Sequence, residues 1–505
     1  MSVHATLGAV TRPVQPTADA AGPVSDRPRL TADDLVAATG GRLLRRGSRP
    51  ARRGAVDSRL VQPDMLFAAL PGERTDGHRF LADAARAGAA ALLIGREPDL
   101  AAGEPPLEAL GDVTAVLAAD PLRALQAVAA AWRARFSPIV VGVTGSIAKT
   151  STKEAVAAVL AGRFATLRSE GNRNNEVGLP LTVLDLGPEH QAAVLEMGMY
   201  ASGEIRDLAA IARPAIGVVT AVQPVHLSRL GSIEAIEDAK AELVEALPPA
   251  ADGGVAVLNA DDERVRRMAR RTPARVVTYG FAPDADVRAA AVVPRGFEGM
   301  AFTLETPAGR REVAIPALGR LAVHNALAAA AVGLAAGMAL DEIVPGMVAG
   351  GSAPHRSAVH RAGGVTVIDD AYNASPGSVR AALDLLAGLP GRRVAVLGEM
   401  LELGDAHNAG HREVGEAAAG VVDLLVVVDG GGDRSAQLMA DGARAGGLAP
   451  ERVAVAGAAS VAGLLGGPGG WLRPGDVVLV KASRGVELER VVEELLALLD
   501  RGPGA

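Results

Sequence analysis

The chain has 505 residues, enough for roughly two to four domains; 49% of them are hydrophobic and only 2% are aromatic. A formal charge of −7, with no block rich in lysine or arginine, argues against a nucleic-acid-binding protein. The absence of cysteine excludes disulfides and cysteine-ligated metals and fits a reducing, cytoplasmic location. No apolar run is long enough to span a bilayer, so we expect no membrane insertion.

The first part of the chain predicts a tail followed by a small domain. Residues 1–27 mix proline, alanine, threonine and aspartate without an apolar centre, which predicts a disordered tail and not a signal peptide. Thr31 and Asp34 have the spacing of a helix N-cap and its capping-box partner. We expect a small α/β N-terminal domain over residues 28–118, with helical segments between strand-like runs at 65–70, 90–94 and 113–117.

A central domain is predicted over residues 119–352. After a connecting helix at 120–135, helical stretches alternate with apolar strand-like runs at 139–143, 194–197, 216–220 and 255–259. Strands that are apolar throughout indicate a parallel sheet covered by helices on both faces. Alternating residues and turn-forming glycines over 287–315 predict an antiparallel excursion from this sheet.

A C-terminal domain is predicted over residues 353–505. Five strand-like runs alternate with helical segments, at 365–368, 393–397, 424–428, 453–456 and 477–480. Repeated strand–helix units without a long insertion indicate a Rossmann-like, doubly wound fold.

The most informative segment is 139–151, where an apolar strand enters a turn of small residues and Lys149-Thr150 then opens a helix. In that context Lys149 can reach the β- and γ-phosphates of a nucleotide, and the Thr150 hydroxyl can hold Mg²⁺. Because Val143 and Ala148 occupy the glycine positions of the general motif, an ordinary turn with a surface lysine is an equal alternative on this pattern alone. We expect Ala148 to have right-handed helical dihedrals, since the helix starts directly after it. The residues expected to contact ATP here are Gly145, Ser146, Ile147, Ala148, Lys149, Thr150 and Ser151.

Two further polar residues are expected near this loop, because ligands of parallel sheets bind at the carboxyl ends of the strands. Glu196 ends one predicted strand, and His226 follows the next. Carboxylate and hydroxyl oxygens are ligands that Mg²⁺ prefers. Taken alone, Glu196 could equally be a salt-bridged strand end, and His226 an ordinary loop residue.

Together these segments resemble the ATP-dependent Mur ligases of cell-wall synthesis, whose phosphate loop runs T-G-x-x-G-K-[ST], and the resemblance extends over about residues 30–499. It implies a P-loop-type ATPase domain at the centre, with Thr150, Glu196 and His226 as the magnesium set. Lys240 stands at the position of a lysine that is carbamylated by CO₂ and then binds a second Mg²⁺. Read without the resemblance, Lys240 is a solvated helix lysine among acidic neighbours.

The resemblance also assigns residues to the substrates. The segment 171–180, G-N-R-N-N-E-V-G-L-P, is similar to a loop that contacts the nucleotide-sugar substrate, which assigns Asn174 and Asn175 to that substrate. The helix start at 324–330 is similar to the adenine-contacting segment, with Asn325 as the contact, although Leu321 and Ala322 replace the usual His-Asn upstream.

The remaining motifs lie in the C-terminal and N-terminal domains. Arg356, after His355 in place of a common glycine, is expected to reach ATP and, with Lys149, Lys240 and His226, to be catalytic. The segment 369–376, D-D-A-Y-N-A-S-P, matches a family motif that places Asp370 and Asn373 beside the nucleotide. The residues implied in substrate binding are Lys481, Ser483 and Arg484 at the amine donor or acyl intermediate, and Ser58 and Arg59 at the uridine nucleotide.

The resemblance implies a monomer that uses ATP and Mg²⁺ to join D-alanyl-D-alanine to UDP-N-acetylmuramoyl-tripeptide through an acyl phosphate, in peptidoglycan precursor synthesis. One alternative is a related ligase with another amine donor, which the Asn174-Asn175 loop and the lack of a D-N-P-R motif disfavour. Another is a nucleotide-binding pseudoenzyme, suggested by Ala148, Leu321 and His355. Against it stand the retained Lys149, Thr150, Glu196, Lys240 and Arg356. The third peptide residue and the domain arrangement are left open.

Overall fold

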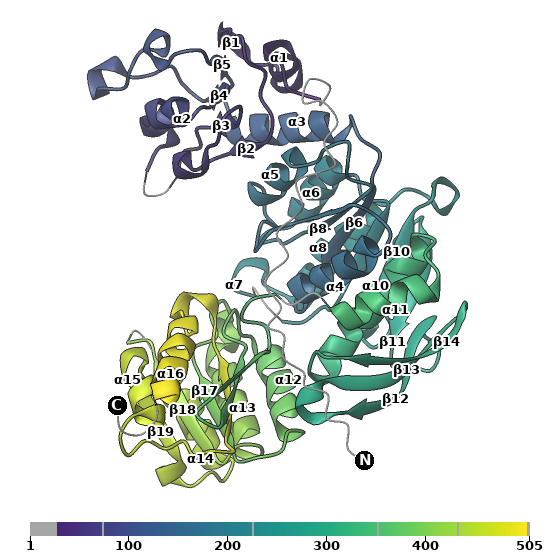
Figure 1. The fold of residues 1–505 in the computed structure, drawn as a ribbon, viewed down its shortest axis with the longest axis vertical. Helices are drawn as coiled ribbons and strands as arrows, with labels where there is room; N and C mark the ends of the chain where they lie inside the picture. Colours follow the sequence, from purple (N-terminus) through teal and green to yellow (C-terminus); the bar gives the residue numbers. More distant parts are fainter. Residues whose placement is uncertain (1–27, 73–74, 225–226, 351–352, 432–433, 502–505) are drawn as a thin grey trace, which may run out of the picture.

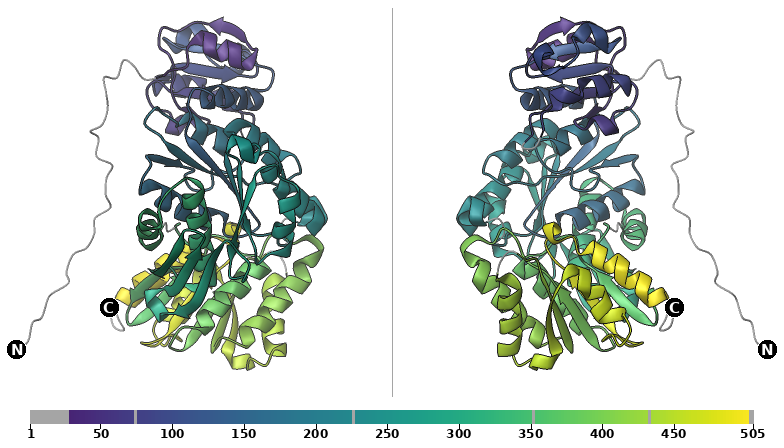
Figure 2. Two further views of the ribbon diagram at one scale, coloured as in Figure 1. Left: turned by 90° about the vertical axis from the view of Figure 1, so that its right-hand side faces the viewer. Right: turned by 90° about the vertical axis from the view of Figure 1, so that its left-hand side faces the viewer.

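The computed structural model describes residues 28–72, 75–224, 227–350, 353–431 and 434–501. The tail predicted over 1–27 lies outside the described residues. Three sheets follow one another along the long axis of the molecule, and the views of Figures 1 and 2 show the N-terminal and C-terminal sheets at opposite ends. Among the described residues, no helix is both long and apolar enough to cross a bilayer.

The N-terminal sheet has five strands in the order β1-β5-β4-β3-β2. Their bounds are Arg42–Arg45 (β1), Gly54–Ala55 (β2), Leu66–Ala68 (β3), Ala91–Ile94 (β4) and Thr114–Leu117 (β5). Helix α1 (Ala32–Thr39) begins at the predicted N-cap, since the Thr31 side chain accepts a hydrogen bond from the Asp34 amide and Asp34 reciprocates. The two edge strands β1 and β2 were not predicted, because they are short and carry polar or small residues.

The central sheet has nine strands in the order β14-β13-β12-β11-β10-β9-β6-β8-β7. The strands from β7 to β12 run parallel, whereas β12, β13 and β14 pair antiparallel, which confirms the predicted excursion. The bounds are Ile139–Thr144 (β6), Thr166–Arg168 (β7), Ala192–Glu196 (β8), Ile216–Val219 (β9), Val255–Asn259 (β10), Arg275–Gly280 (β11), Val287–Pro294 (β12), Met300–Thr306 (β13) and Gly309–Ile315 (β14).

Both faces of the central parallel part of this sheet are buried, as the apolar strands predict. In β6, Val140 packs into a core with one group of helices, and the adjacent Val141 packs into a second core with the other group. The first group is α3 (Pro121–Arg133), α5 (Gly178–Leu184), α6 (Glu204–Ala212) and α8 (Ile233–Glu245), and the second is α4 (Lys149–Ala161), α10 (Gly319–Ala335) and α11 (Leu340–Ala349). The chain leaves β6 for β7 and β8 on one side and returns to β9 on the other, so β6 is the switch point where such sheets bind ligands.

The C-terminal sheet has six strands in the order β15-β16-β20-β17-β18-β19, all parallel except the unpredicted edge strand β15. The strands are Ala358–Ala362 (β15), Val365–Asp369 (β16), Arg393–Leu397 (β17), Leu424–Asp429 (β18), Val453–Gly457 (β19) and Val477–Lys481 (β20). Helices α12 (Pro376–Ala387), α13 (His407–Ala419) and α14 (Ser435–Ala445) cover one face, and α15 (Ala458–Gly466) and α16 (Glu489–Arg501) the other. This is the doubly wound arrangement predicted for this part of the chain.

Close packing of α13 on α14 depends on glycines. A Cβ added at Gly415 would collide with the carbonyl oxygen of Met439, which is part of the α14 backbone. We expect Gly415→Ala to lower the free energy of unfolding by about 2 kcal/mol or more, because the helices cannot separate without losing their other contacts. Urea unfolding measures the change. Gly420→Ala is the control: Gly420 has right-handed dihedrals, and a Cβ added there would lie 3.7 Å from the Ala417 carbonyl oxygen, so unchanged stability is expected. Equal stability of the two variants would contradict the packing argument.

Candidate active site between the central and C-terminal sheets

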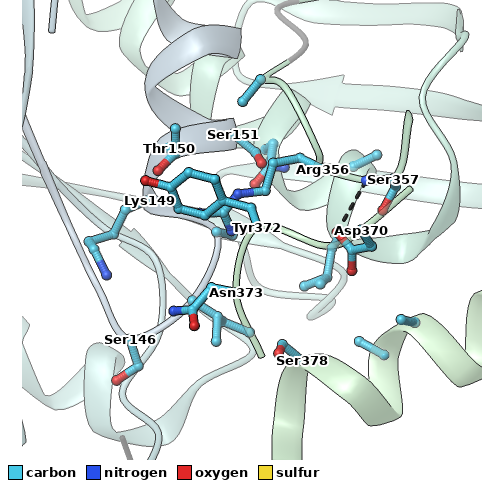
Figure 3. Close-up of a pocket in the computed structure, with 18 of the residues that line it drawn as sticks. Ser146, Lys149, Thr150, Ser151, Arg356, Ser357, Asp370, Tyr372, Asn373 and Ser378 are labelled. Atoms are coloured by element: carbon cyan, nitrogen blue, oxygen red, sulfur yellow. Dashed lines mark hydrogen bonds between the residues drawn. The ribbon is translucent and has the colours of Figure 1, made fainter. Parts of the chain in front are cut away.

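A cavity of about 1400 Å³ lies between the central sheet and the C-terminal sheet. Among the segments that line it are the phosphate loop (residues 146–151), the amide-rich loop at 172–176, the start of α10, and the segments after β16 and β20. Figure 3 shows residues of the phosphate loop facing Arg356, Asp370, Tyr372 and Asn373 across this space. The structure therefore brings together most of the nucleotide-side residues predicted from the sequence.

The phosphate loop is fixed to the neighbouring strand before any ligand binds. The Ser146 amide donates to the Ala221 carbonyl at 2.7 Å, and the Thr220 hydroxyl donates to the Ile147 carbonyl at 2.6 Å. The Lys149 ammonium donates to the Gly145 carbonyl at 2.7 Å and so folds back over the loop. Burial, opposed by the charge of Glu196 and assisted by that of Arg356, lowers the pKa of Lys149.

The expectation for Ala148 is wrong. Ala148 has φ 64° and ψ 2°, in the left-handed region, and it precedes the first residue of α4 as its N-cap. An N-cap residue lies outside the helix, so the curl of the loop sets its dihedrals and the helix does not. The alanine Cβ makes this conformation costly by about 1–2 kcal/mol, which a glycine would avoid.

The predicted magnesium ligands Thr150 and Glu196 are both buried beside this loop. β8 pairs with β6 so that Glu196 lies opposite Val143, just before the loop begins. One Glu196 oxygen accepts a hydrogen bond from the Asn174 side chain at 2.8 Å, and the other is buried and has no hydrogen-bond partner among the described residues. A buried carboxylate oxygen left unpaired at a cavity that a threonine also lines fits Mg²⁺ that also binds nucleotide phosphates and water. His226 lies outside the described residues, and within them no group of three or more acidic, histidine or cysteine side chains could hold a metal by itself.

Lys240 is not the solvated helix lysine of the alternative interpretation. It lies on the inner face of α8, is only 2% exposed and lines the cavity. Its acidic neighbours face away from the cavity, where Glu237 pairs with Arg264 at 2.9 Å and Asp238 pairs with Arg271. Burial and, secondly, the charge of Lys149 lower the pKa of Lys240 well below its ordinary value.

The C-terminal sheet contributes a second group of residues to the cavity. Asp370 accepts hydrogen bonds from the Ser357 amide at 3.1 Å and from the Lys481 ammonium at 2.6 Å. Lys481 also donates to the main-chain carbonyl of Asn373 at 2.9 Å, and burial lowers its pKa. These contacts fasten the loop after β16 to the end of β20, so Lys481 already has partners within the protein.

The other predicted substrate residues are placed in different ways. Ser483 accepts from the Leu401 amide and donates to the Ala374 carbonyl, so its hydroxyl holds two loops together. Asn325, at the cavity, accepts from the Thr152 hydroxyl at 2.9 Å, and Asn175 accepts from the Gly178 amide. Ser58 and Arg59 lie in a short helical turn of the N-terminal domain (Ser58–Leu60) and do not line the cavity; the Arg59 side chain is exposed and pairs with Asp57.

Comparison with known proteins identifies the family of this chain. Family models match residues 55–160 (Mur ligase family, catalytic domain), 143–333 (Mur ligase middle domain) and 355–484 (Mur ligase, glutamate ligase domain). The UDP-N-acetylmuramoyl-tripeptide–D-alanyl-D-alanine ligase of Mycobacterium tuberculosis (strain ATCC 25618 / H37Rv) is 40% identical over 87% of this chain and 91% of that protein. The chain belongs to the Mur ligase family.

Further Mur ligases extend the comparison. The Bacillus subtilis ligase of the same name is 35% identical, over 88% of this chain and 92% of that protein. MurF from Acinetobacter baumannii superposes with a TM-score of 0.81 at 28% identity, covering 93% of this chain and 99% of that one. MurF ligase from Thermotoga maritima, solved in complex with ADP, gives a TM-score of 0.75 at 27% identity over 89% of this chain and 98% of that one.

Sequence reasoning missed two buried ionic residues that support the site of this Mur ligase. Lys153, fully buried one turn after Lys149, donates to the Ser169 carbonyl at 2.7 Å, and the Ser169 hydroxyl accepts from the Glu196 amide. Glu242, 3% exposed on α8, accepts from the Gly203 amide at 2.6 Å and the Arg206 amide at 3.0 Å at the start of α6. Both residues stand among charged neighbours in sequence, so no pattern distinguishes them from surface residues.

The strain at Ala148 is present in the folded chain before ATP binds. We therefore expect Ala148→Gly to raise the free energy of unfolding by up to about 1 kcal/mol, while the KM for ATP changes less than about tenfold. Urea unfolding and initial-rate kinetics measure the two quantities. Ala158→Gly, in the interior of the same helix, is the matched control and should lower stability by about 1 kcal/mol. Destabilisation by both substitutions would show that Ala148 carries no strain.

Proposed function

We propose that this chain is an ATP-dependent ligase that joins D-alanyl-D-alanine to UDP-N-acetylmuramoyl-tripeptide. The curated relatives that it matches along nearly their whole length bear that name. One observation carries the proposal: the side chains of Lys149, Lys240 and Arg356 line one cavity, which the buried carboxylate of Glu196 also lines. Such a site suits the binding and transfer of a phosphoryl group, where positioning and charge neutralisation do most of the catalysis.

The proposed reaction has two steps. In the first step, a terminal carboxylate oxygen of the tripeptide attacks the γ-phosphorus of ATP and the bond from that phosphorus to the β,γ-bridging oxygen breaks. The products are an acyl phosphate, which stays in the site, and ADP, the leaving group. The dipeptide amine then attacks the acyl carbon, phosphate leaves with the bonding electron pair, and the amine loses a proton. Lys149 would neutralise the β- and γ-phosphates from the central sheet, and Arg356 would do so from the C-terminal sheet.

Mg²⁺ is proposed as the cofactor, with Thr150 and Glu196 as its protein ligands and His226 as a further member of the set. When bound, Mg²⁺ supplies positive charge that neutralises the phosphate oxygens. The side-chain amide of Asn174 donates to one Glu196 oxygen. The other Glu196 oxygen, which has no hydrogen-bond partner among the described residues, would be the one that binds the metal. Asn325 would contact the adenine, and Asp370 and Asn373, which also line the cavity, would lie beside the nucleotide.

Lys240 is proposed to be carbamylated. A neutral amine attacks CO₂, a C–N bond forms and a proton is released, which leaves an anionic carbamate. The lowered pKa of Lys240 favours the neutral amine that this reaction needs. The change from cation to anion would also remove the repulsion between Lys240 and Lys149 and supply oxygen ligands for a second Mg²⁺.

The remaining assignments complete the proposal. Asn174 and Asn175 would bind the nucleotide-sugar substrate, and Ser58 and Arg59 its uridine end. Lys481, Ser483 and Arg484 would lie at the amine donor or at the acyl phosphate, whose phosphoryl group is the former γ-phosphate. We propose domain limits at 28–118, 119–352 and 353–505, a monomer, and a cytoplasmic location.

The reaction itself is directly testable. We expect continued ADP release to require both UDP-N-acetylmuramoyl-tripeptide and D-alanyl-D-alanine, because the acyl phosphate cannot form without the tripeptide and is not consumed without the dipeptide. A coupled assay for ADP, run with each substrate omitted in turn, measures this. Equal turnover with diaminopimelate or lysine and a nucleotide that bears only the dipeptide would contradict the assignment in favour of a related ligase. No turnover with any amine would favour the pseudoenzyme.

Lys240→Ala tests the carbamate. We expect this variant to lose most of its turnover and still bind ATP, because Lys149 and the phosphate loop remain in place. Short carboxylic acids in the medium should restore part of the activity by supplying the oxygens of the missing carbamate. Lys149→Ala is the control, since the same acids cannot replace a cation there. Near wild-type turnover of Lys240→Ala would contradict the role.

A further inference from the structure

Two arginines in the cavity share one aromatic ring. The guanidinium carbon of Arg356 lies 4.3 Å from the ring centre of Tyr372, and that of Arg484 lies 4.8 Å from the same centre. Both distances are within the range in which a cation is attracted to the face of an aromatic ring. Figure 3 shows Arg356 beside this ring, in the cavity that Lys149 and Thr150 also line.

Neither arginine is held by a carboxylate of the residues that the structure describes. Within the described residues, no salt bridge joins Arg356 or Arg484 to an acidic side chain, and the buried Nε of Arg356 has no hydrogen-bond partner. Two guanidinium groups at one ring repel each other, and the negative face of the ring is the attractive partner that they share. Tyr372 thus takes the place that a carboxylate usually occupies, and both cations keep their charge available to an anionic ligand.

Hydrogen bonds hold the backbone on both sides of Arg356 against the segment that carries Tyr372. The Tyr372 amide donates to the His355 carbonyl at 3.2 Å, and the Ser357 amide donates to Asp370 at 3.1 Å. His355 and Ser357, which flank Arg356, both have positive φ, of 57° and 53°. Strained dihedrals persist only where the surroundings impose them, so the loop is held in the one conformation that lays Arg356 against the ring.

We propose that Tyr372 is a positioning residue whose ring is the common platform for Arg356 and Arg484, and that it holds both cations at the γ-phosphate of the nucleotide. The inference rests on the proposed function, because it assigns the cavity to ATP. It gives the tyrosine ring a role separate from that of its hydroxyl. Burial raises the pKa of the Tyr372 hydroxyl, so this group stays protonated at neutral pH and is not a base.

The test compares binding of a triphosphate with binding of a diphosphate, and so needs no turnover. Isothermal titration of the full chain with ADP and with β,γ-methylene-ATP, both with Mg²⁺, gives the ratio of their dissociation constants. We expect Tyr372→Leu to weaken the triphosphate about tenfold and to change ADP less than about twofold. Tyr372→Phe keeps the ring and should leave the ratio within about twofold of that of the wild type.

Two further variants make the result specific. Phe164→Leu removes a ring that lies 5.4 Å from Arg163 and outside the cavity, and it should leave the ratio unchanged. Arg484→Gln leaves the tyrosine in place and should also weaken the triphosphate, which keeps the test available if Tyr372→Leu does not fold. Because Tyr372 and Arg484 act through one contact, a variant that carries both Tyr372→Leu and Arg484→Gln should lose little more affinity for the triphosphate than the weaker-binding single variant.

The outcomes separate this inference from the proposed function. Equal losses in Tyr372→Phe and Tyr372→Leu would show that the hydroxyl is the functional group and would overturn the platform. A ratio unchanged in Tyr372→Leu, or a wild type without preference for the triphosphate, would overturn it as well. The expected ratios in a protein that does not join the two proposed substrates would support the platform and reject only the ligase assignment.

Discussion

Repulsion between cations that share one sheltered cavity is the constraint on which the site depends. Lys149, Lys240 and Arg356 line this space, and none of them forms a salt bridge with a described acidic residue. Burial already disfavours the charged forms of Lys149 and Lys240. The charge of Glu196 opposes the lowering of the Lys149 pKa, whereas Arg356 lowers the pKa of Lys149 further and Lys149 lowers that of Lys240. An anion with several negative charges removes this cost on binding, so the arrangement favours a phosphate-bearing ligand over an empty site.

The fold supplies these cations from two directions. The switch point at β6 places the phosphate loop between β8 and β9, with Glu196 at the end of β8. β16 and β20 are neighbours in the C-terminal sheet, so the loops that carry Tyr372 and Arg484 leave the same edge. The cavity is therefore bounded by the carboxyl ends of strands in two separate sheets, where neither sheet alone would enclose a nucleotide.

Part of the backbone strain of the described residues lies at the same place. Ala148, His355 and Ser357 all have positive φ, and all belong to segments that line the cavity or flank it. Hydrogen bonds hold these segments, from the Thr220 hydroxyl to the phosphate loop and from the Ser357 amide to Asp370. The site is thus shaped in advance, at the expense of local stability, which is the usual arrangement where geometry must be ready before a reaction.

The sequence by itself determined the three α/β units, because continuous apolar strands such as β10 and β17 allow only a sheet covered on both faces. It also located the phosphate loop, Glu196 and Arg356, since each stands directly beside a predicted strand or within a motif. Short polar edge strands such as β7 and β15 escaped prediction because their residues make few core contacts. Only the tertiary structure decided that Lys240 is buried, that Ala148 is left-handed and that one tyrosine ring serves two arginines. These properties depend on which helix face, loop curl or distant chain segment lies opposite a residue, and a local pattern holds no information about that.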